Sequence, residues 1–211
     1  MEMKLRKCIV PYAGLVLLAG CASFQSGSFI NRGAMWEMKD EKSKPAFSSV
    51  ALSWKQVPFK SATELIGVSP EKKIPKLYPV KAKDEAYFRR KASDILKKAG
   101  VYDVENGSGT ANIVLTSYGK WTYKSLMRGF LVDTAFIMIL PRSIVVRYRL
   151  TAEGEISGKP FQVEETAIRK TTFHLFLFPL YPLLTPQRVE RALIRSMLWN
   201  LSHKIYKKTG T

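Results

Sequence analysis

Two stretches of the chain place apolar residues at helical spacing. The first follows Asp84, a residue type that caps helices, and ends before Gly100. The second opens at Thr185-Pro186 and closes on basic residues that complement a helix dipole. The two apolar faces consist of Phe88, Ala92, Ile95, Leu96 and Ala99, and of Val189, Leu193, Met197, Leu198, Leu201 and Ile205. Each pattern predicts an amphipathic helix.

Other stretches alternate apolar and polar residues or are rich in β-branched and aromatic residues. The clearest alternation runs from Ile144 to Thr151, as expected when one face of a sheet is buried and the other is wet. The remaining predicted strands cover 48–57, 101–104, 111–123 and 161–173, with a turn over EGEISGKP pairing the last with 144–151 as a hairpin. This order predicts an α+β fold, a mostly antiparallel sheet packed with two amphipathic helices, in a single domain over 47–211.

The N-terminus has the three parts of an export signal. Basic residues open the chain, an apolar run over 9–19 is too short to span a bilayer, and small residues follow it. The run ends in Leu18-Ala19-Gly20-Cys21, which resembles the lipobox of bacterial lipoproteins. The resemblance implies a signal peptide over 1–20, cleavage before Cys21 and acylation of its thiol and amine. Residues 21–46, rich in Ser, Gly and charge, are expected to form a lipidated flexible tether.

In that class the residue after the cysteine influences sorting. Here it is Ala22, so we expect the outer membrane, with the lipid-anchored domain facing the periplasm. Cys8 and Cys21 are the only cysteines, and the loss of Cys8 with the signal leaves no intramolecular disulfide in the mature protein.

The chain is strongly basic. Its net charge is +17, of which residues 1–20 carry +2, leaving +15 on the mature part. Such a surface attracts polyanions, and export disfavours nucleic acid, so the expected partners are anionic lipid, lipopolysaccharide or an envelope protein. The alternative is that the charge only solvates the domain.

A local pattern runs from Ala92 to Leu115: an amphipathic helix, the step Ala99-Gly100-Val101-Tyr102-Asp103-Val104, a turn, and Ala111-Asn112-Ile113-Val114-Leu115. It is similar to small α+β domains of periplasmic lipoproteins, of the curli-secretion type and of the activators of peptidoglycan synthases. The resemblance implies the fold class and no particular function.

Two apolar runs, Gly129–Leu140 and Phe173–Leu184, are each too short to span a bilayer. If the strands over 111–123, 144–151 and 161–173 form a meander, the first run and the exit of the second lie at one sheet end, near Lys120, Lys124, Arg128, Arg142 and Lys170. That end could contact a membrane or an apolar partner. The expected contact residues are Phe130, Leu131, Phe136, Ile137, Met138, Phe176, Phe178, Leu180 and Tyr181. The alternative is that both runs pack inside the domain.

The sequence contains none of the common catalytic or metal-binding signatures. Its carboxylates Glu153, Glu155, Glu164 and Glu165 are interpreted as hydrated surface charges, and His174 and His203 belong to no sequence cluster with zinc spacing. We therefore expect no catalytic residues, metal or cofactor, and a non-enzymatic accessory, assembly or binding factor of the envelope. The alternatives are a carrier of apolar ligands, or a cell-wall or lipid hydrolase using Asp133, His174 and a serine.

Overall fold

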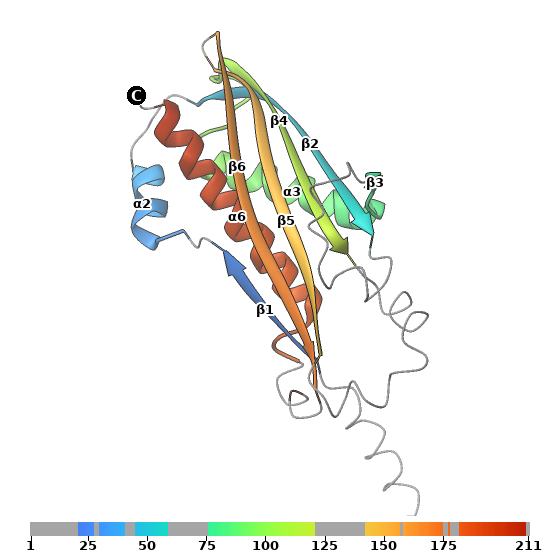
Figure 1. Cartoon of the computed structure of the whole chain (residues 1–211). Helices are drawn as coiled ribbons and strands as arrows, with labels where there is room; N and C mark the ends of the chain where they lie inside the picture. The colour runs from blue at the N-terminus through green and yellow to red at the C-terminus, as the bar shows by residue number, and fades with distance from the viewer. Residues whose placement is uncertain are drawn as a thin grey trace, which may run out of the picture.

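A six-stranded sheet with helices on one face forms the protein in the computed structural model (Figure 1). The structure describes residues 21–27, 30–40, 45–58, 76–120, 142–156, 158–174, 177 and 182–209. The strands are β1 (Cys21–Gly27), β2 (Phe47–Pro58), β3 (Tyr78–Pro79), β4 (Gly109–Lys120), β5 (Arg142–Ile156) and β6 (Lys159–Phe173). The helices are α2 (Arg32–Asp40), α3 (Ala82–Lys98) and α6 (Pro186–Thr209). The α+β prediction is confirmed, with one more helix than expected.

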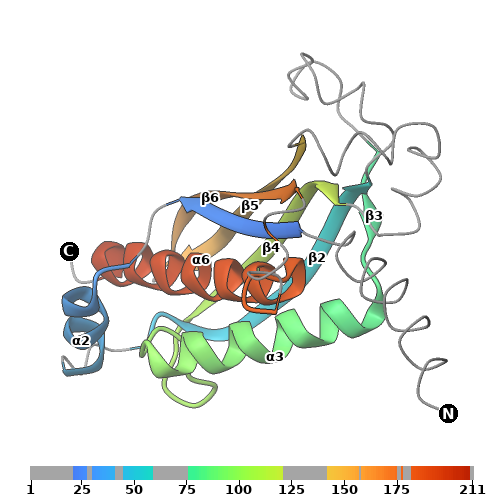
Figure 2. The same ribbon diagram turned by 90° about the horizontal axis from the view of Figure 1, so that it is seen from below.

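The strand order is β1-β6-β5-β4-β2-β3, and every neighbouring pair is antiparallel except β2 with β4. The helices α3 and α6 lie side by side on one face of the sheet (Figure 2). The core between these layers contains Phe88 and Leu96 of α3, Ile113 of β4, and Leu193 and Leu198 of α6. Burial of these apolar side chains is the main force that holds the two layers together.

The strands β4, β5 and β6 form a meander, because they are adjacent and successively antiparallel. The hairpin between β5 and β6 is tighter than expected, since β5 continues to Ile156, which pairs with Lys159. Gly154 permits this continuation: a Cβ there would lie 2.0 Å from the carbonyl oxygen of Thr110 on β4. The prediction of a strand over 101–104 is wrong. The structure has a single bridge there, between Tyr102 and Phe47.

The structure corrects the expectation of a flexible tether over 21–46. Cys21–Gly27 pairs with β6 as an edge strand, and both Ala22 and Ser23 are fully buried. Met38 of α2 also belongs to the core. The Ser and Gly content suggested a mobile linker, but small side chains also suit a strand beside α6. The predicted signal peptide, 1–20, lies outside the described residues.

An Ala22→Glu substitution should lower the free energy of unfolding by about 3 kcal/mol, because it buries a charge without a partner. The matched Ser26→Glu change, at an exposed position of the same strand, should cost about 0.5 kcal/mol or less. Urea unfolding of both variants measures the difference. If both substitutions changed the free energy of unfolding by an equally small amount, the result would support a flexible tether over these residues.

Candidate functional site at the Cys21 end of the sheet

Cys21 lies at the sheet end where the predicted apolar segments begin and end. Phe173, the last residue of β6, is paired with Cys21 on one side and with Arg142, the first residue of β5, on the other. Segment 121–141 leaves the sheet at Lys120 and returns at Arg142, while 175–181 follows β6. We call this border, formed by Cys21, Lys120, Arg142 and Phe173, the Cys21 end. It brings together the proposed lipidation site and the bases of both apolar runs.

The predicted contact residues themselves lie outside the described residues. They are Phe130, Leu131, Phe136, Ile137, Met138, Phe176, Phe178, Leu180 and Tyr181. Whether these residues are buried or exposed therefore stays a prediction. The described structure fixes the points at which their segments leave and rejoin the fold.

A glycine bulge turns Lys120 toward the helices. Val57 pairs with Tyr118 and Pro58 pairs with Lys120, so Gly119 is an extra residue, with φ +77°. Such a bulge shifts the alternation of side chains between the two faces. The Nζ of Lys120 consequently lies 4.0 Å from the ring centre of Trp54 and 3.1 Å from Asp84 Oδ2. Its side chain is only 13% exposed, so this lysine, expected near the apolar sheet end, adds little positive charge to the outer surface.

Glu190, in the first turns of α6, joins three strands beneath this end. Its Oε1 accepts a hydrogen bond from the Tyr148 hydroxyl at 2.7 Å and lies 3.4 Å from Lys120 Nζ. Its Oε2 lies 3.4 Å from the buried Arg169 guanidinium. Burial, followed by the negative charge of Glu190, raises the pKa of Tyr148 well above its ordinary value. Glu190, Tyr148, Lys120 and Arg169 form what we call the Glu190 cluster.

The segment that leads into α6 is fastened to the same strands. The carbonyl oxygen of Leu184 accepts a hydrogen bond from the Ser23 amide at 2.9 Å, and that of Pro186 accepts one from the Arg169 guanidinium at 3.0 Å. Ser23 Oγ and Thr171 Oγ1 share a buried hydrogen bond of 2.7 Å. Thr185 caps α6 as predicted, accepting from the Arg188 amide at 3.4 Å. These bonds hold the exit of the second apolar run against β1 and β6.

The four carboxylates expected at the surface do not share one environment. Glu153, Glu155 and Glu164 are exposed, as predicted, but Glu165 is 3% exposed and faces α6. It lies 2.6 Å from Lys204 Nζ and accepts a hydrogen bond from Asn200. Neighbouring residues of a strand face opposite sides, and this places Glu165 inward beside outward-facing Glu164. Its partners are those of a structural ion pair.

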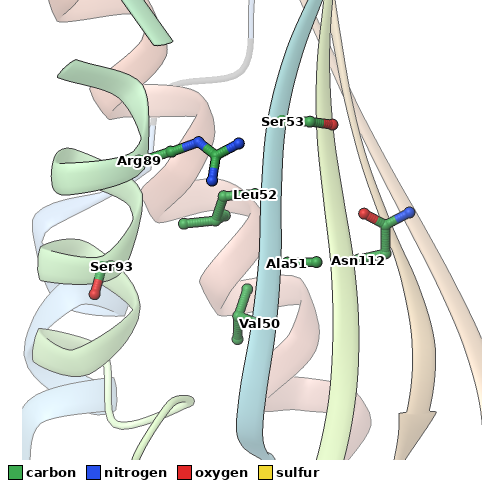
Figure 3. A pocket seen from close by; sticks show the side chains of 7 residues that line it. All are labelled: Val50, Ala51, Leu52, Ser53, Arg89, Ser93 and Asn112. Atoms are coloured by element: carbon green, nitrogen blue, oxygen red, sulfur yellow. The ribbon is translucent and has the colours of Figure 1, made fainter. Parts of the chain in front are cut away.

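The residues that line a shallow groove beside β2 do not form a catalytic arrangement. Figure 3 shows Arg89 on the α3 side and Asn112 on the sheet side. The lining residues are Val50, Ala51, Leu52, Ser53, Arg89, Ser93 and Asn112. The charged one, Arg89, already pairs with Glu85 at 2.8 Å. Asp133, which the hydrolase alternative requires, lies outside the described residues.

Within the part of the chain that the structure describes, no three His, Cys, Asp or Glu side chains are grouped to hold a metal ion. No helix among the described residues is long and apolar enough to span a membrane. His203 lies 3.8 Å from Glu37 of α2.

No protein-family model matches the chain, and a search of curated proteins found no match.

Glu190→Ala should lower the free energy of unfolding by about 3 kcal/mol, because it removes a counter-charge of buried Arg169 and the acceptor of Tyr148. Glu105→Ala, at an exposed position, is the control and should change it by about 0.5 kcal/mol or less. Urea unfolding measures both. A cost for Glu190→Ala as small as that of the control would show that the cluster does not hold α6.

The Glu190 cluster also predicts a pH dependence. An unfolded chain releases the Tyr148 proton near pH 10, whereas the folded protein retains it because the pKa of Tyr148 is raised. The contribution of this residue to the free energy of unfolding is therefore fully present below pH 10 and decreases above it. The wild type should lose about 1.4 kcal/mol per pH unit above pH 10 relative to Tyr148→Phe, until the folded-state pKa is reached. Unfolding measured from pH 7 to 12 checks this. Parallel profiles for the two proteins would contradict it.

Proposed function

We propose that this protein is a lipid-anchored lipoprotein of the bacterial envelope, attached to the outer membrane through Cys21 and facing the periplasm. Its domain acts as a non-enzymatic accessory, assembly or binding factor through the Cys21 end. The observation that carries the proposal is the pairing of Cys21 with Phe173, which puts the lipobox cysteine beside the bases of both apolar runs. Lipobox, apolar runs and fold thereby converge on one border of the domain.

The position of Cys21 supports action at the membrane surface. Acyl chains on Cys21 contribute about 0.8 kcal/mol per buried CH₂, so two or three chains attach a protein stably. Because Cys21 is itself the first residue of β1, no spacer separates the anchor from the fold. The anchor would therefore hold the Cys21 end at the bilayer.

The pairing of the buried charges supports a binding role over a catalytic one. Glu190 is engaged by Tyr148 and Lys120, and Glu165 by Lys204 and Asn200. Catalytic acids and bases need access to a substrate, whereas these carboxylates connect α6 to the sheet. Their geometry supports a rigid platform for partner binding.

Cys21→Ser should abolish acylation and release the protein from the outer-membrane fraction. Cys8→Ser is the matched control, because Cys8 is the other cysteine of the chain and lies inside the predicted signal. This change should leave acylation of Cys21 intact. Membrane fractionation with mass spectrometry of the N-terminal peptide measures both. An unmodified Cys21 in the wild type, with fractionation equal to that of Cys21→Ser, would overturn the proposal.

A further inference from the structure

Exposed apolar side chains lie along the border of the sheet that contains Cys21. Leu183 is 67% exposed, and it lies beside the start of β1 because the next residue, Leu184, bonds to Ser23. Leu77 and Tyr78, 42% and 43% exposed, lie at β3 on the other edge of the same border. Single exposed apolar side chains are common on soluble proteins, so these three gain meaning from their place on the border that contains Cys21.

The border is slanted relative to the strands. Sheet pairing aligns Tyr78 with Gln56, Ser117, Tyr148, Ala167 and Gly27, and Gly27 is six residues from Cys21 along β1. Six residues span about 20 Å along a strand, and the five strand spacings from β3 to β1 span about 24 Å. One flat surface can therefore meet both edges if the strands tilt by about 40° from its normal.

Basic side chains flank these apolar residues. Lys76, Lys81 and Lys83 are exposed around β3 and the start of α3, and Arg188 is exposed in the first turn of α6. The nearby acids do not offset them, since Asp84 pairs with Lys120 at 3.1 Å and Glu85 pairs with Arg89 at 2.8 Å. Among the residues that the structure describes, the border therefore combines apolar groups with positive charge that no nearby acid offsets.

Acidic side chains collect at the opposite end of the sheet. Glu153 and Glu155 approach the hairpin between β5 and β6, and Asp103 and Glu105 lie in the turn before β4. Exposed lysines lie there as well, among them Lys97 and Lys98 at the end of α3 and Lys159 at the start of β6, so acids and bases offset each other at that end. Among the described residues of the border that contains Cys21, by contrast, exposed bases predominate. An anionic surface would orient the domain with the Cys21 end toward it.

We propose that the domain docks on the anionic phospholipid surface that carries its own acyl chains. Leu77, Tyr78 and Leu183 enter the interfacial region, while the exposed bases contact the phosphates. These bases are Lys76, Lys81, Lys83 and Arg188. The inference rests on the proposed lipid anchor, which supplies a high local concentration of this surface. A bilayer fits better than a protein partner because one flat surface can meet both edges of the border, where apolar and basic side chains occur together.

The test uses the acylated protein purified from membranes, with its acyl group verified by mass, in vesicles of phosphatidylcholine with or without phosphatidylglycerol. A polarity-sensitive fluorophore is placed at Gln187→Cys in the first turn of α6, or at Ser108→Cys near the hairpin end as control; both positions are exposed. In phosphatidylglycerol vesicles, brominated lipids should quench the label at 187 and not the label at 108. Phosphatidylcholine alone should give much weaker quenching at 187.

Charge reversal separates docking from anchoring. Each basic residue near an anionic surface strengthens attachment about fivefold, so Lys76→Glu, Lys81→Glu and Lys83→Glu together should lower the ratio of docked to undocked protein at least tenfold. The control, Lys97→Glu, Lys98→Glu and Lys159→Glu, changes the net charge equally away from the Cys21 end and should leave quenching at 187 intact. Both triple variants should stay acylated.

Equal exposure of the two labels in acylated protein would overturn docking and leave the proposed anchor in place. Burial of the label at 187 only after addition of an envelope protein extract would also overturn it, in favour of a protein partner. An unmodified Cys21 in the purified wild type would overturn the anchor and, with it, the docking that rests on it.

Discussion

The pairing of β1 with β6 is the constraint on which the rest of this structure depends. It aligns Cys21 with Phe173 and thereby ties the start of the folded chain to the exit of β6. It also buries Ser23 against Thr171 and places β1 beside α6. Because the strand begins at Cys21 itself, an acyl group there would be attached to the sheet and not to a linker. The anchor and the domain would then behave as one body.

The Glu190 cluster gives this end of the sheet its rigidity. Charged groups taken out of water lose hydration free energy, so a buried ion cluster adds little net stability even though removing one partner is costly. Its geometric effect is more specific: Glu190 and Pro186 bind α6 to Tyr148 and Arg169 on β5 and β6. The position where α6 begins is thus fixed relative to β1. The Cys21 end presents a defined surface because of these bonds.

Local patterns in the sequence predicted α3, α6 and the hairpin of β5 with β6, whereas long-range contacts decided the parts that were missed. Asp84 does not cap α3 as expected, because the helix begins at Ala82 and Asp84 lies in its first turn. The segment CASFQSG of β1 has a linker-like composition, and its pairing with residues 167–173 cannot be read from its neighbours. The inward orientation of Lys120 was missed because the bulge at Gly119 reverses the face to which its side chain points. The burial of Glu165 was missed because its partners, Lys204 and Asn200, lie on a helix that is distant in the sequence. The predicted apolar contacts lie outside the described residues.

Amide hydrogen exchange of the acylated protein tests the central claim, that β1 starts at Cys21, the residue proposed to carry the acyl chains. The amides of 22–27 that bond to β6 should exchange as slowly as those of 167–172, their partners, because the two strands open together. Fast exchange over 22–27 beside slow exchange over β5 and the rest of β6 would contradict it. That result would indicate that residues 22–27 form a flexible tether, and that an acyl group on Cys21 would not be held directly by the sheet.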